Sequence, residues 1–103
     1  MEIKTIDIAA KEYFDKVNAN SYFSGIITLN FSLPDQKDIA IPYQLGYGIQ
    51  YEYAALHQLE TENILPVNNK TIWEYCRQNN ILLRSNKKRN CLKSEAKNFI
   101  KYV

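Results

Sequence analysis

The sequence is poor in the residue types on which metal centres and nucleophilic active sites depend. It has two cysteines, Cys76 and Cys91, and a single histidine, His57, among 103 residues. A structural zinc site needs four closely spaced thiolate or imidazole ligands, and no C-x-x-C pair is present. Any histidine-based acid–base chemistry would have to use His57, and no nucleophile elbow accompanies it. We therefore predict a protein that is not an enzyme and that binds no metal and no cofactor.

Long apolar runs are also missing. The longest span only a few residues, whereas a helix needs about 20 apolar residues to cross a bilayer, so we expect no membrane segment. Residues 1–4 carry mixed charge and lead into an alternating pattern, not into an apolar signal core. Two cysteines without an export signal usually remain free thiols. Together these features predict a soluble cytoplasmic protein.

Glycine is scarce, and two of the three glycines, Gly46 and Gly48, stand where an alternating pattern gives way to a helical one. A dinucleotide fingerprint would need a third glycine where Tyr51 stands, and the P-loop lysine is absent. The pair can close backbone amides around an anion at a helix start, or it can allow a tight turn. Nearby tyrosines could line a pocket or stack on bases. A small-molecule or nucleotide pocket would comprise Tyr43, Gly46, Tyr47, Gly48, Tyr51 and Tyr53.

Hydrophobic alternation predicts strands over residues 2–8, 22–31 and 38–45. Turn-forming residues separate the last two runs, which indicates an antiparallel hairpin. Pro42 has no amide hydrogen to donate, so it favours a sheet edge or a bulge. Residues 81–84 are short and apolar, which is typical of a buried strand or an extended connection.

A helical period appears in four other segments. Apolar residues recur at helical spacing in 9–17 and 50–63 and again after Leu92. A capping box, Thr71 followed three residues later by Glu74, starts a helix that ends near residue 79. We predict a single α+β domain over residues 1–103, with a small, mostly antiparallel sheet built on a central β-hairpin and covered by three to four helices.

Charge is divided unevenly along the chain. Residues 1–69 carry four basic and nine acidic side chains, a net charge of −5, whereas residues 70–103 carry nine basic and two acidic ones, a net charge of +7. Residues 85–90 read as a polar, basic loop, and lysines recur every fourth position in the helix that follows. Such a face can neutralise phosphates, and binding through it is sensitive to salt. It can equally be an ordinary solvated surface.

Two segments carry a resemblance. Residues 18–24 read Asn-Ala-Asn-Ser-Tyr-Phe-Ser, and residues 41–51 read Ile-Pro-Tyr-Gln-Leu-Gly-Tyr-Gly-Ile-Gln-Tyr. Over roughly residues 13–56 the chain resembles a set of uncharacterised small phage and prophage proteins, which tend to have glycine where Ala19 stands. The resemblance implies no activity. It implies a mobile-element setting inside a bacterial host, where short accessory proteins commonly act by binding, as anti-CRISPR and other anti-defence inhibitors do.

We therefore expect an accessory protein that binds a macromolecular partner through a basic C-terminal face. The partner would be a nucleic acid, or an acidic or nucleic-acid-handling host complex, for example a CRISPR-type defence complex, that the protein inhibits. A homo-oligomer, with the acidic half of one copy against the basic half of another, is a further alternative. The contact residues that we predict are Arg77, Arg84, Lys87, Lys88, Arg89, Lys93, Lys97 and Lys101.

Overall fold

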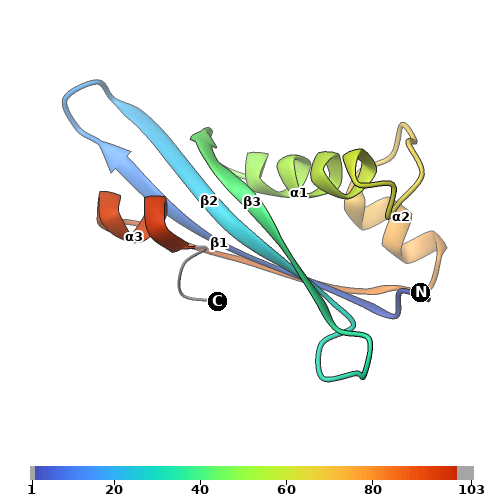
Figure 1. Cartoon of the computed structure of the whole chain (residues 1–103). Coiled ribbons are helices and arrows are strands. Elements are labelled where there is room, and N and C mark those ends of the chain that lie inside the picture. Colours follow the sequence, from blue (N-terminus) through green and yellow to red (C-terminus); the bar gives the residue numbers. More distant parts are fainter. Residues whose placement is uncertain (1, 100–103) are drawn as a thin grey trace.

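A computed structural model describes residues 2–99 of the chain (Figure 1). Within these residues one sheet is accompanied by three helices. The strands are β1 (Thr5–Asp15), β2 (Asn20–Leu29), β3 (Lys37–Leu45) and β4 (Leu82–Lys88), and the helices are α1 (Gln50–Thr61), α2 (Ile72–Gln78) and α3 (Lys93–Asn98). The predicted α+β class is confirmed.

The sheet has the strand order β3-β2-β1-β4. The two pairs β1–β2 and β2–β3 are antiparallel, and the β2–β3 hairpin is the one that the sequence predicts. Strand β4 instead lies parallel to β1, with Thr5 opposite Leu82 and Lys11 opposite Lys88. The sheet is therefore mixed, and three helices accompany it in the described part of the chain.

The helix predicted over residues 9–17 is wrong, because β1 continues through this segment to Asp15. Its ladder with β2 runs without interruption to the pair Asp15–Asn20. The segment fits a helical period and also the two-residue period of a strand, because Ala10 and Glu12 alternate with Ala9 and Lys11. Pairing with the most strand-like run of the sequence decides between the two periods, since tertiary context overrides local pattern. The chain reverses at 16–19, where Ala19 has a φ of 55°.

The basic loop predicted over residues 85–90 is also wrong in part. Strand β4 extends to Lys88, so that only residues 89–92 connect it to α3. Residues alternate across this strand: Leu83, Ser85 and Lys87 face α1 and α2, whereas the side chains between them face the other side. Residues 85–88 resemble a loop in sequence because β4 is an edge strand and the side chains on one of its faces are exposed.

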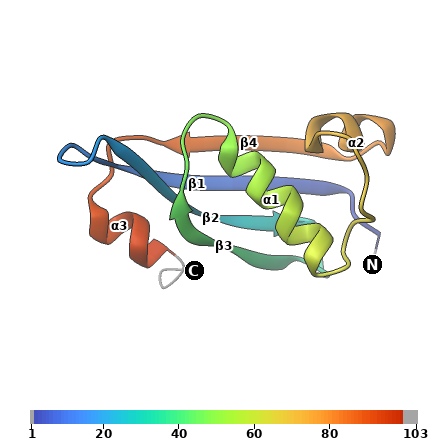
Figure 2. The same ribbon diagram turned by 90° about the horizontal axis from the view of Figure 1, so that it is seen from above.

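The two faces of the sheet are covered differently. Helices α1 and α2 lie on one face, where α1 crosses the strands and α2 lies over β4. Helix α3 lies on the other face, at the end where β1 turns into β2 (Figures 1 and 2). The core fills the space beneath α1 and α2. Its largest fully buried side chains include Phe23, Ile6, Ile27, Leu29, Ile41, Leu59 and Cys76.

Local signals fix the remaining elements. Pro42 lies on β3, an edge strand, and the register of β2 against β3 shifts beside it, between Phe23 and Gly25. The Thr71 capping box is formed: Glu74 N–H donates to Thr71 Oγ1 at 3.1 Å, and Thr71 N–H donates to Glu74 Oε1 at 3.2 Å. Both predictions are confirmed. Among residues 2–99, no helix has both the length and the apolar character that crossing a membrane requires.

Candidate functional site

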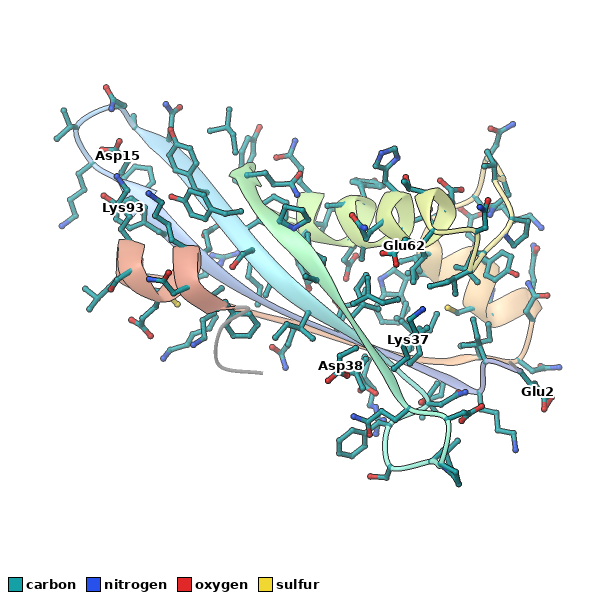
Figure 3. All side chains as sticks on the ribbon, viewed as in Figure 1. Glu2, Asp15, Lys37, Asp38, Glu62 and Lys93 are labelled. Atoms are coloured by element: carbon teal, nitrogen blue, oxygen red, sulfur yellow. The ribbon has the colours of Figure 1, made fainter. Side chains whose placement is uncertain are left out.

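Basic side chains gather at one end of the molecule, around α3 and the β1–β2 hairpin. We call this region the basic end. In the β1–β4 register Lys11 stands opposite Lys88, and α3 packs on β1 and β2 beside them. Figure 3 shows Lys93 close to Asp15 of the hairpin. The basic side chains of the basic end are Lys11, Lys16, Lys88, Arg89, Lys93 and Lys97. With the acidic Asp15 and Glu95 they give this end a net charge of +4.

Both acidic groups of the basic end have lowered pKa values. Asn18, through its side chain and backbone, is the main cause for Asp15, and Lys93 adds to it. For Glu95 the main cause is the Leu92 backbone N–H, which donates to Oε1 at 3.0 Å, and Lys88 and Lys11 contribute further. The Lys88–Glu95 pair is long, at 3.9 Å, and exposed, so it adds little to stability.

Helix α3 is held on the sheet by a buried hydrogen bond and by two cation–π contacts, one of which uses its own Lys97. Ser24 Oγ donates to the Ala96 carbonyl, and Ala96 is fully buried. Two cation–π contacts add to this docking: Lys11 Nζ lies 4.6 Å from the Phe99 ring centroid, and Lys97 Nζ lies 6.0 Å from that of Tyr43. Lys93 and Lys97 lie four residues apart on the same side of the helix, and both residues are exposed.

Only part of the predicted basic set meets at this end. Lys88, Arg89, Lys93 and Lys97 are exposed there. Arg84 lies further along β4 and pairs with Asp7 at 2.6 Å. Arg77 is exposed on α2, at the opposite end of the sheet (Figure 1). Lys101 lies outside the described residues.

Lys87 has a different position altogether. Its side chain is 7% exposed on the α1 face, where Nζ pairs with Glu12 Oε1 at 2.9 Å and donates to the Gly48 carbonyl at 2.7 Å. This lysine joins β4, β1 and the turn before α1. It therefore has a structural position, and its charge is offset by Glu12.

Lys11 and Lys16 belong to the basic end and were missed by the sequence-based prediction. Both belong to the acidic half of the sequence, and only the hairpin brings them beside α3. Lys11 would have been found from strand alternation in residues 9–15, because alternation places it on the face opposite Ala10 and Glu12.

The glycine pair makes the joint between β3 and α1. Gly46 is buried, and a Cβ there would lie 2.5 Å from Phe23 Cε1. Its N–H donates to the Ser21 carbonyl at 2.9 Å, and the next amide, of Tyr47, donates to Gln50 Oε1 at 2.8 Å. Gly48 has a φ of 61°, the left-handed region that favours glycine. The tight turn is thus formed, and two of its amides are bonded within the protein.

The four tyrosines of this stretch point to different places. Tyr43 stacks on Tyr22 on the α3 face, with ring centroids 5.5 Å apart, and burial is the main cause of its raised pKa. Tyr51, on α1, is buried, whereas Tyr47 and Tyr53 are exposed. A depression of about 450 Å³ lies beside Gly46. Its lining residues are Phe14, Ala19, Asn20, Ser21, Leu45, Gly46, Tyr47 and Gln50.

A buried polar chain links α1 with β4 and α2. Ser85 Oγ donates to Glu52 Oε2 at 2.7 Å, and Trp73 Nε1 donates to Glu52 Oε1 at 3.0 Å. The Tyr51 hydroxyl lies 2.7 Å from Ser85 Oγ. Because Ser85 has one hydroxyl hydrogen and gives it to Glu52, Tyr51 must be the donor. Burial raises the pKa of Tyr51, with the Glu52 charge as a smaller cause.

His57 lies exposed on α1. No group of three or more histidine, cysteine, aspartate or glutamate side chains in the described part of the chain could hold a metal ion. Comparisons with known protein families, with curated proteins and with solved structures found no match to this chain.

Proposed function

We propose that the chain is a small accessory protein of a phage or other mobile element that acts by binding, in the cytoplasm of its bacterial host, and that it contacts nucleic acid through the basic end. The observation that carries this proposal is the net charge of +4 on one end of a molecule whose sequence totals only +2. The rest of the sequence carries a net charge of −2, so the positive field of the molecule is directed at one surface.

The composition of the basic end supports phosphate contact. Lysine and arginine neutralise phosphates and release counterions, and this supplies most of the affinity of non-specific binding. Strand β4, helix α3 and their connection supply four of the basic side chains, Lys88, Arg89, Lys93 and Lys97. The β1–β2 hairpin adds Lys11 and Lys16. A surface built from several elements of the folded protein presents its charges in a fixed arrangement.

Fluorescence anisotropy with labelled duplex DNA, single-stranded DNA and an RNA hairpin tests the proposal. For four phosphate contacts, affinity for duplex DNA should fall on the order of 100-fold between 50 and 200 mM salt. The double variant K93E/K97E should weaken binding strongly. The matched control K70E/R77E makes the same change in net charge on exposed residues of the loop before α2 and of α2 itself, and it should have much less effect.

Absence of binding at low salt, or equal losses in the two double variants, would refute nucleic-acid binding through the basic end. A pull-down from the bacterial host would then identify a nucleic-acid-handling protein complex as the partner. K93E/K97E should lose that complex if the same surface is used.

A further inference from the structure

A small pocket lies between α1 and α2, on the face of the sheet opposite the one that α3 covers. Its volume is about 70 Å³, well below the roughly 300 Å³ at which sites for whole small molecules begin. The pocket is therefore large enough for the head of one side chain and too small for a nucleotide. Its lining residues are Ile49, Glu52, Tyr53, Thr71, Ile72 and Trp73.

Glu52 supplies the charge of this pocket. The residue is 9% exposed, and both carboxylate oxygens accept hydrogen bonds, one from Trp73 Nε1 and one from Ser85 Oγ. Both donors are neutral. Each carboxylate oxygen has a second lone pair, so the group can accept further hydrogen bonds.

The buried charges around Glu52 do not balance. Glu12 and Lys87 neutralise each other, and no ion pair within residues 2–99 includes Glu52. Lys87 Nζ lies 5.7 Å from the centroid of the Tyr51 ring and is already bonded to Glu12 and to Gly48. A carboxylate that is buried without a cation is costly, and a cation arriving from outside would offset that cost.

The walls of the pocket are suited to an organic cation. Tyr53 and Trp73 are 52% and 48% exposed, so each is free to present a ring to a ligand, and Ile49 adds an apolar rim at 57% exposed. Aromatic faces attract ammonium and guanidinium groups. Exposed aromatic residues around a small pocket are also typical of sites where a protein partner inserts one anchoring side chain.

We propose that this pocket binds the cationic head of a lysine or arginine side chain from a protein partner. Glu52 accepts hydrogen bonds from the cation, and Trp73 and Tyr53 contact it with their rings. The site lies on the α1 and α2 face of the sheet, away from the basic end. It would therefore contact a protein partner in addition to the nucleic acid bound at the basic end.

Trp73 is the only tryptophan of the chain, and its fluorescence reports directly on this pocket. The probes are two capped tripeptides, Gly-Lys-Gly and Gly-norleucine-Gly, which differ in the ammonium group. The wild-type protein should bind the lysine peptide about tenfold or more tightly than the norleucine peptide. Equal affinity for the two peptides would overturn the proposal.

The variant E52Q removes the charge and keeps the shape. Its amide can still accept from Trp73 and donate to Ser85, whose proton then turns to the Tyr51 hydroxyl oxygen. The preference for the lysine peptide should disappear in E52Q and persist in E62Q, a control at an exposed position just after α1. A preference retained in E52Q would overturn the proposal.

A second variant, Y53L, guards against a folding defect, because Tyr53 is exposed and its loss leaves the core intact. It should weaken binding of the lysine peptide several-fold with an unchanged unfolding temperature. If Trp73 emission of the protein alone changes with protein concentration, and K93E/K97E removes that change, the partner is a second copy. That outcome supports the cation site and identifies the source of the cation.

Discussion

Replacing Lys87 by methionine tests whether this lysine is structural. Its side chain is 7% exposed and its Nζ pairs with Glu12 Oε1 at 2.9 Å. Methionine keeps most of the aliphatic length and leaves the Glu12 carboxylate buried without a cation. Breaking a buried pair in this way costs about 3–5 kcal/mol, whereas an exposed pair contributes about 1 kcal/mol or less. The expected loss is a large fraction of the roughly 5–15 kcal/mol that stabilises a small domain.

Urea denaturation followed by Trp73 fluorescence measures this loss. With a denaturant slope of about 1.5 kcal/mol per molar, the midpoint should fall by about 2–3 M. R84M is the matched control, because Arg84 belongs to the same strand and pairs with Asp7 with a side chain that is 53% exposed. The double variant E12M/K87M should recover most of the stability, because it leaves no buried charge. Equal and small losses in K87M and R84M would refute the reasoning.

Three further predictions concern single positions. Ala19 has a φ of 55°, so A19G should raise stability by up to about 1 kcal/mol in thermal unfolding. At Gly25 a Cβ would lie 2.8 Å from the Ala9 carbonyl oxygen and 3.1 Å from Ile41 Cδ1, so G25A should cost about 1–3 kcal/mol by urea titration. Burial raises the pKa of Cys76 from 9.0 to about 11, so alkylation at pH 8 should require unfolding, as mass spectrometry would show. Because the folded state holds this proton more tightly, stability should fall as pH rises from about 9 to 11, and C76A should reduce the fall.

The sequence predicts the β2–β3 hairpin, helices α1 and α2 and the edge position of Pro42 because these features depend on local signals. The β1–β2 pairing shows where local signals fail. Tyr13 and Phe14 fit both a helix and a strand, and only the pairing of Tyr13 with Tyr22 decides between them. The parallel pairing of β4 is still less visible, because its partner strand lies at the start of the chain.

The candidate site is predictable to a similar extent. Lys93 and Lys97 follow from the helical period, and the structure exposes both. Lys87 could not be recognised as buried from its neighbours, because its burial depends on Glu12, 75 residues away. The pocket at Glu52 depends on Trp73 and Ser85, which belong to two other elements, and no local pattern joins them.

The parallel pairing of β4 with β1 has a consequence for the newly made chain. Strands β1, β2 and β3 can pair as soon as residue 45 has left the ribosome, but the other edge of β1 remains open until residues 82–88 emerge. At about 5–20 residues per second this delay is roughly 2–9 s. Throughout it Glu12 has no Lys87 beside it, and its charge lies next to an unpaired strand edge. A charge in that place discourages wrong pairing with other chains, so the carboxylate that later pairs with Lys87 also protects the unfinished sheet.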